Sequence, residues 1–198
     1  MTPRNTTVPS GQANERSSKT NAPVARARGR APGRSGASGV GPTMALHAVT
    51  GAFGYSGRHV ARALLEAGHE VRTLTRSPDR PHDLPRPVPA FPLAFDDPAR
   101  LREALAGVDV LINTYWVRFS RAGFSQARAV SESKALFDAA RAAGVRRVVH
   151  LSITNPSAKS PYPYFRGKAE VESALRSSGL RHAILRPPDH ADRHGDAI

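Results

Sequence analysis

The chain has 198 residues, enough for one domain of ordinary size, and it carries a formal net charge of +13. It contains no cysteine, which excludes disulfides, thiolate catalysis and cysteine-ligated zinc. We expect no membrane span, because no apolar run reaches the roughly 18 residues that a transmembrane helix needs. The eight histidines show no metal-binding spacing, so no metal site is predicted. These features indicate a soluble, cytoplasmic protein.

Residues 1–43 form a segment of distinct composition. They contain seven basic residues against one acid, Glu15, and few large apolar side chains. Such a segment cannot bury enough surface to offset the entropy lost on ordering, so we predict a disordered basic tail. A targeting peptide, an arm for an acidic partner and an extension without function remain open, whereas the lack of aromatic residues argues against nucleic acid. Met44, directly before the first predicted strand, is a candidate for the natural start.

From Met44 onward, strand-like and helix-like segments alternate. Strands are predicted over 45–50, 70–75, 91–95, 108–113, 147–152 and 182–185, and helices over 57–67, 98–106, 126–143 and 164–177. Short apolar strands separated by helices are typical of a parallel sheet that is covered on both faces. We therefore predict an α/β fold, a Rossmann-type doubly wound parallel sheet, over residues 44–198. The expected inward side chains are Val60, Leu64 and Ala67 in the first helix and Val130, Phe137 and Ala140 in the third.

A glycine-rich turn joins the first predicted strand to the first predicted helix. The sequence TGAFGYSG spans Thr50 to Gly57, and Gly51, Gly54 and Gly57 follow one another at intervals of three. Such a turn lets backbone N–H groups approach a dinucleotide pyrophosphate, with the positive end of the helix behind them. We predict a dinucleotide phosphate site here. The alternative is an ordinary glycine-rich turn, because the spacing differs from the G-x-G-x-x-G fingerprint.

The end of the second predicted strand bears on which dinucleotide is bound. An acid there would bind the ribose 2′-hydroxyl of NAD, whereas an arginine accommodates the 2′-phosphate of NADP. This chain has Arg76 at that point, and the next acid is Asp79. We therefore favour NADP(H), with Arg58 or Arg80 as helpers. NAD(H) stays possible, and the alternative for Arg76 is a solvated loop residue.

A tyrosine and a lysine lie four residues apart in the segment YFRGK. Tyr164 and Lys168 share one face of the last predicted helix, where an ammonium can lower the pKa of a phenol and ready it for proton transfer. Ser152 and Thr154 follow the preceding strand, and a hydroxyl there can orient a substrate carbonyl. Tyr162 is the nearest rival, but it has no lysine four residues on. We predict a proton-transfer site, and a plain amphipathic helix is the alternative.

Several segments together carry a family likeness. TGAFGYSG, LAFDDPARLREALAGVDVLIN, VRRVVHLSITNPS, PYFRGKAEVESAL and HAILRP resemble the short-chain dehydrogenase/reductase superfamily over about residues 44–188. More narrowly, they are similar to its extended and atypical members, the NAD-dependent epimerase/dehydratase, NmrA-like and complex I 39-kDa-subunit-like proteins. The resemblance implies a catalytic set of Ser152, Thr154, Tyr164 and Lys168. It implies dinucleotide contacts from Gly51, Phe53, Gly54, Tyr55, Gly57, Arg76, Asn113, Lys168 and Pro187.

The chain departs from the family pattern at three points. Asn113 is followed by Thr-Tyr-Trp rather than by small residues, and the helix asparagine of many active members is replaced around Ala129 to Glu132. Extended members also continue beyond this chain's end at Ile198 to form a substrate domain. We expect a Rossmann domain without that part, with a frameshift or premature stop as one explanation. The apolar surface left uncovered would favour a homodimer or aggregation.

Three functions follow from these observations. The first is an NAD(P)(H)-binding oxidoreductase or epimerase/dehydratase-like enzyme that acts on a carbonyl or sugar-like substrate through Tyr164. The second is an NmrA-like or complex I-like protein that binds the dinucleotide without turnover and serves in regulation or assembly. The third is an inactive fragment. The substrate itself is not readable from the sequence, because the residues that would select it are absent.

Overall fold

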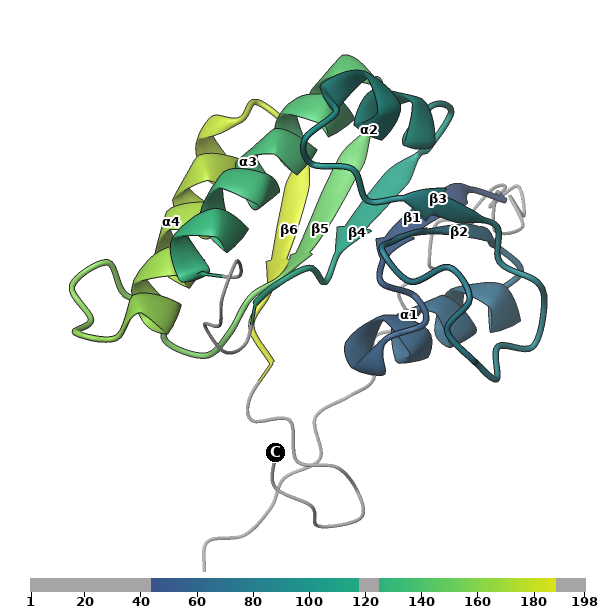
Figure 1. Ribbon diagram of the computed structural model, residues 1–198, viewed down its shortest axis with the longest axis horizontal. Coiled ribbons are helices and arrows are strands. Elements are labelled where there is room, and N and C mark those ends of the chain that lie inside the picture. The colour runs from purple at the N-terminus through teal and green to yellow at the C-terminus, as the bar shows by residue number, and fades with distance from the viewer. Residues whose placement is uncertain (1–43, 118–124, 188–198) are drawn as a thin grey trace, which may run out of the picture. The chain divides into compact units, whose positions relative to one another are not determined.

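The computed structural model describes residues 44–117 and 125–187, and within them six strands form one sheet flanked by helices (Figure 1). The strands are β1 (Leu46–Thr50), β2 (Glu70–Thr75), β3 (Ala90–Pro92), β4 (Val110–Asn113), β5 (Arg147–Leu151) and β6 (His182–Leu185), and the helices are α1 (Tyr55–Glu66), α2 (Pro98–Ala104), α3 (Gln126–Ala142) and α4 (Pro163–Ser177). All neighbouring strands are parallel, in the order β3-β2-β1-β4-β5-β6. This is the Rossmann strand order, so the predicted fold class is confirmed.

Local sequence signals set the helix bounds. Asp97 caps α2, because its side chain accepts a hydrogen bond from the Arg100 N–H, and Ser125 caps α3 in the same way. Gly144 follows α3 at a φ of 75°, a left-handed conformation that glycine adopts at little cost. The predicted elements therefore agree with the observed ones to within a few residues at most ends.

Two details of the sequence prediction are wrong. The third strand is shorter than the predicted 91–95, because its partner strand β2 ends at Thr75, which pairs with Pro92. Ala67 is exposed and lies just beyond α1, whose fully buried residues are Gly57, Ala61 and Leu65. Val60 and Leu64 pack only partly against the core, so the buried face of α1 is rotated by one residue from the predicted one.

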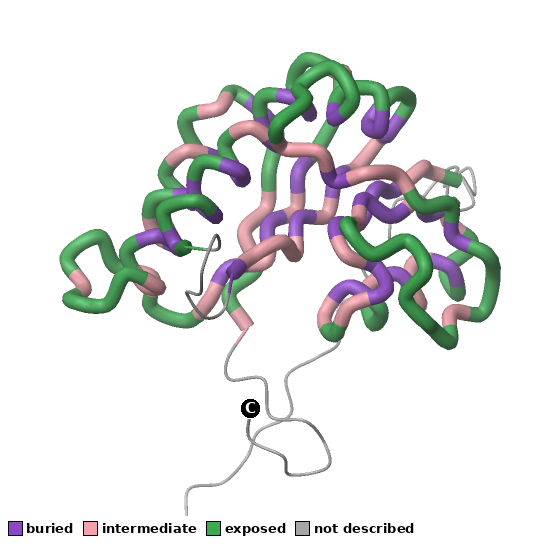
Figure 2. Tube along the Cα trace, in the orientation of Figure 1, coloured by how far each residue is buried: buried purple, intermediate pink, exposed green. Residues whose placement is uncertain are grey.

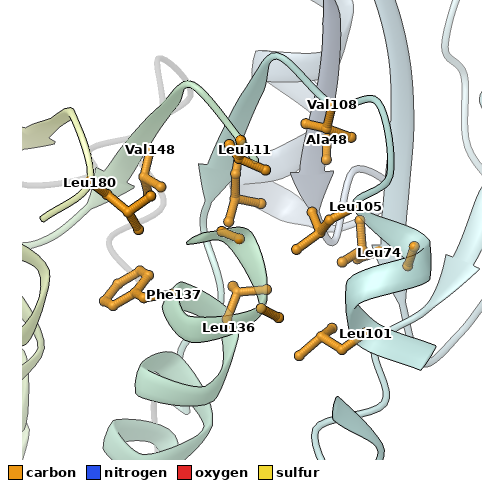
Figure 3. Packing of buried hydrophobic residues seen from close by; sticks show 14 of the residues in the cluster. Ala48, Leu74, Leu101, Leu105, Val108, Leu111, Leu136, Phe137, Val148 and Leu180 are labelled. Atoms are coloured by element: carbon orange, nitrogen blue, oxygen red, sulfur yellow. The ribbon is translucent and has the colours of Figure 1, made fainter. Parts of the chain in front are cut away.

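The core has two parts, one on each face of the sheet. The larger part lies between the sheet and α2, α3 and α4, and it includes Leu74, Leu111 and Val148 from the strands and Leu136 from α3 (Figures 2 and 3). Val130, Phe137 and Ala140 are buried here, as predicted. The smaller part lies under α1. These two cores fix the carboxyl ends of the strands, where the predicted site residues gather.

Helix α1 covers only one part of its face of the sheet. Among the described residues, α1 contacts β1 and β2, whereas the other three helices pack on the opposite face. Val149 and Leu151 of β5 are consequently only half-buried, and Leu185 of β6 is 52% exposed. The apolar surface that the sequence analysis expects to be left uncovered, and its effect on association, stay predictions. No helix in the described part of the chain is long and apolar enough to cross a membrane.

Candidate functional site

The glycine-rich turn brings α1 against the end of β1. The Gly51 N–H donates to the Leu74 carbonyl at 2.8 Å, and Gly51 has a φ of 67°. A Cβ on Gly57 would lie 2.1 Å from the Gly51 carbonyl oxygen, so no larger residue fits there without backbone movement. Gly54 precedes the helix, supplies no side-chain cap, and no acid occupies the first turn of α1. The first N–H groups of α1 are therefore suited to an anionic group such as a pyrophosphate.

The two aromatic residues of the turn lie in different surroundings. Phe53 is 5% exposed and stacks on His82 with ring centroids 4.2 Å apart, so its side chain belongs to the smaller core. Tyr55 begins α1 and is exposed, and the Arg58 guanidinium lies 5.6 Å from the centre of its ring. Of this predicted pair, only the Tyr55 side chain lies on the surface beside the turn.

Arg76 follows β2 and reaches toward α3. Its Nη2 donates to Glu132 Oε1 at 2.8 Å, and its guanidinium lies 5.3 Å from the Phe95 ring centre and 6.0 Å from that of Tyr115. The Arg76 side chain is 36% exposed, and these contacts attach it to α3 and to two aromatic rings. It sits one residue beyond the strand that hydrogen bonds to the glycine turn, where a dinucleotide ribose would lie.

Asn113 joins the carboxyl ends of three neighbouring strands. It is fully buried, its Oδ1 accepts from the Tyr115 N–H at 3.0 Å and from the Thr50 hydroxyl at 3.3 Å, and its Nδ2 lies 3.2 Å from His150 Nδ1. Because Nδ2 can only donate, His150 Nδ1 is the acceptor and carries no proton. Burial, with a contribution from Lys168, lowers the pKa of His150 to about 3. The buried side chain of Asn113 thus links the carboxyl ends of β1, β4 and β5.

Tyr164 and Lys168 lie one turn apart on α4, beside the end of β5. Lys168 is 3% exposed, and its Nζ donates to the Leu151 carbonyl at 3.1 Å. The Trp116 ring covers the ammonium, with 4.4 Å from Nζ to the ring centre, and meets the Tyr164 ring edge-on. Burial lowers the pKa of Lys168 to about 8, against the opposing charge of Glu172. The pair and the tryptophan therefore form one compact cluster.

The two predicted hydroxyl groups lie in different surroundings. Ser152 is 3% exposed, and its hydroxyl lies near Glu172. Within the described part of the chain, this hydroxyl makes no hydrogen bond that meets the usual geometric criteria. Thr154 is exposed, and its hydroxyl donates to the Pro187 carbonyl at 2.7 Å. Thr154 and Pro187 thus tie the end of β5 to the end of β6, while Ser152 lies beside the lysine helix.

Glu172 anchors the same helix one turn beyond Lys168, and the sequence analysis misses it. It is 1% exposed, and Arg186 binds it with both Nε and Nη2, at 2.9 and 2.5 Å. Arg176 adds a further bond at 2.8 Å. Burial opposes the charge of Glu172, but the hydrogen bonds from Arg186 and Arg176, together with the nearby Ser152 hydroxyl, outweigh it and lower its pKa to about 2. The spacing of four residues from both Lys168 and Arg176 is the signal that points to it.

A surface groove lies apart from the predicted site residues. An open groove of about 770 Å³ runs between α2 and the end of α3, lined by residues that include Arg100, Glu103 and Ala142. It shares no lining residue with the predicted site and contains mainly surface side chains. Within the described ranges, no group of three or more histidine, aspartate or glutamate side chains is arranged to hold a metal ion.

The comparisons with known proteins agree with this geometry. Residues 51–197 match the model of a family described as NAD(P)H-binding. The match covers most of the chain, which therefore belongs to the NAD(P)H-binding family. Its glycine turn and parallel sheet are the parts that such a family needs for a dinucleotide.

Individual relatives include proteins of different activity. The chain is 34% identical over 142 residues to the photosystem II assembly factor Ycf39 of Cyanophora paradoxa, covering 70% of this chain and 43% of that protein. It is 32% identical over 147 residues to a ceramide reductase of Caulobacter vibrioides, covering 71% and 45%. A solved NADPH-dependent quinone oxidoreductase of Escherichia coli, complexed with NADPH, is 26% identical with a TM-score of 0.58, covering 71% and 48%. The chain spans less than half the length of each of these proteins.

Proposed function

We propose that this chain forms the NADP(H)-binding part of a reductase that acts on a carbonyl-containing substrate, with Tyr164 as the general acid. The observation that carries the proposal is the placement of Tyr164 and Lys168 on one face of α4, at the carboxyl end of β5. The ceramide reductase and the quinone oxidoreductase among the relatives support a reductive function for this arrangement.

The residues of the turn and of α4 divide the chemistry between them. The backbone N–H groups after Gly54 bind the pyrophosphate, since neither a side-chain cap nor an acid competes for them. A reduced nicotinamide, when bound, supplies a hydride to the carbonyl carbon. Tyr164 donates its phenolic proton to the carbonyl oxygen, and the positive charge of Lys168 stabilises the phenolate that remains.

The preference for NADP(H) rests on Arg76. It stands one residue beyond β2, where an acid would otherwise bind the ribose 2′-hydroxyl. The quinone oxidoreductase complexed with NADPH supports the same cofactor. NADP(H) is accordingly the cofactor that we propose, in place of NAD(H).

A second function is favoured by the surroundings of Lys168. Its Nζ donates to Leu151, and the Trp116 ring lies over it, so the ammonium is engaged by protein groups on two sides. The resemblance to an assembly factor fits a chain that binds a dinucleotide without turnover. In that case Tyr164 and Lys168 would serve to shape the binding site only.

The reductase and the binding protein without turnover are distinguished by measuring the activity of two tyrosine variants. The full chain is mixed with NADPH and a panel of aldehydes, ketones, quinones and nucleotide sugars, and cofactor oxidation is followed. For a reductase, Tyr164→Phe lowers kcat by about 10²–10⁴-fold and leaves NADPH affinity unchanged, because only the acid is lost. Tyr162→Phe, at a 65% exposed neighbour, serves as the control and keeps full activity. NADPH binding without turnover on any substrate would support the second function instead.

A further inference from the structure

A buried carboxylate lies beside the end of β2. Glu132, in the second turn of α3, has a side chain that is only 7% exposed. Its Oε1 accepts from Arg76 Nη2 at 2.8 Å and from Arg128 Nε at 2.9 Å, and its Oε2 accepts from the Tyr115 hydroxyl. We call these four residues the Glu132 cluster. They come from three separate parts of the chain that meet at the carboxyl edge of the sheet.

The cluster changes what Arg76 offers to an anion. Two guanidinium groups share one carboxylate oxygen, so the cluster carries a net charge of +1 rather than +2. A carboxylate removed from water acts on nearby charges more strongly than an exposed one, because water and salt screen it less. Any phosphate that approaches Arg76 and Arg128 therefore meets the repulsion of Glu132 as well as their attraction.

Glu132 is not the only contact of Arg76. The Arg76 guanidinium also lies 5.3 Å from the Phe95 ring centre and 6.0 Å from the Tyr115 ring centre, within the range of cation–π attraction. Both rings are half-buried and pack against the larger core. The Arg76 guanidinium therefore has contacts with the fold that do not depend on the charge of Glu132.

We infer that Glu132 sets the cofactor selectivity of this site by weakening the attraction of Arg76 and Arg128 for a ribose 2′-phosphate. The inference rests on the proposed function, in which Arg76 lies beside the dinucleotide ribose, and it adds Arg128 as a second residue that faces the phosphate. A 2′-hydroxyl carries no charge, so binding of NAD(H) is indifferent to Glu132. Glu132 thus narrows the difference in affinity between the two cofactors.

The test compares two small ligands that differ only at the 2′ position. Binding of 2′,5′-ADP and of 5′-AMP to the full chain is measured by calorimetry for wild type and Glu132→Gln. We expect the affinity for 2′,5′-ADP to rise about tenfold in the variant, because a poorly screened negative charge is removed, while that for 5′-AMP stays unchanged. Asp138→Asn is the control. Asp138 lies on the same helix as Glu132, but its carboxylate pairs with Arg141 and not with Arg76 or Arg128. This substitution should change neither affinity.

Further outcomes bear on the inference. If Glu132→Gln does not fold, Glu132→Met removes the charge at similar volume, and the same rise is expected, because Arg76 and Arg128 are 36% and 49% exposed and water can solvate the charges left behind. An unchanged or lowered affinity for 2′,5′-ADP in the folded variant, with 5′-AMP still bound, would overturn the role of Glu132 alone. A wild-type chain that binds neither ligand would overturn the proposed dinucleotide site and this inference with it.

Discussion

The two halves of the candidate site are built in different ways. The half at β1 and α1 is made of main chain: Gly51 bends the turn, and Gly57 lets the helix approach the Gly51 carbonyl more closely than any side chain allows. The half at α4 is made of charged side chains withdrawn from water, with Lys168 and Glu172 both at most 3% exposed. We call these the turn half and the helix half of the site.

This difference determines what each half is sensitive to. The turn half depends on space, so an added methyl group is enough to disrupt it. The helix half depends on partners, because a buried charge is stable only while its hydrogen bonds and ion pairs persist. Glu172 is held by Arg186 and Arg176, and its low pKa records how strongly they favour its charged form. Mutations and pH should therefore separate the two halves.

The largest effect is expected from Gly57→Ala in the turn half. The new Cβ would lie 2.1 Å from the Gly51 carbonyl oxygen and 3.0 Å from the Ala52 Cα, which are backbone atoms that cannot rotate away. We expect a loss of about 3 kcal/mol in the free energy of unfolding, at the upper end for overpacked positions. Denaturant titration followed by circular dichroism measures it.

Gly68→Ala is the matched control for that substitution. Gly68 has a φ of 85° but open space around it, so an alanine there meets backbone strain of about 1–2 kcal/mol and no clash. If Gly57→Ala cost no more than Gly68→Ala, the close approach of α1 to the turn would not exist, and the contrast between the two halves would fail.

The sequence predicts the turn half better than the helix half, for the same physical reason. Glycine spacing, strand and helix follow one another locally, and the segments predicted at 45–50 and 57–67 are observed as β1 at Leu46–Thr50 and α1 at Tyr55–Glu66. The partners of buried charges are set by how helices pack on the sheet. Arg76 meets Glu132, 56 positions away, and Arg186 meets Glu172, 14 positions away. No periodicity in a single sequence reports such pairings.

Arg76→Ala sharpens the comparison by testing the charged side chain that follows β2, beside the turn half. The substitution removes the group that we place at the 2′-phosphate, so NADPH affinity should fall by about 1.5–3 kcal/mol, the range for hydrogen bonds to charged groups. NADH affinity should change little. Arg147→Ala, at an exposed arginine that begins β5, is the control for loss of one positive charge. Equal weakening of NADPH and NADH binding by Arg76→Ala would contradict the proposed cofactor preference.

The smallest effect concerns pH and the buried histidine beneath the helix half. His150 is fully buried, its pKa is lowered from 6.5 to about 3, and its Nδ1 accepts from Asn113. The folded state therefore binds fewer protons than the unfolded state between these pH values, so stability falls as the pH drops below 6.5. At pH 5.5 the loss from His150 alone is about 1.4 kcal/mol relative to neutral pH, because each unit below the unfolded pKa is worth that amount. His150→Gln replaces the imidazole by an amide that does not titrate, so denaturant titrations at pH 7.5 and 5.5 should show a pH dependence smaller by that amount. The contribution of Glu172 would appear only further down, as the pH falls from 4.5 toward 2, which leaves the window for His150 separate. An undiminished dependence in His150→Gln would show that the acid sensitivity of the fold arises elsewhere.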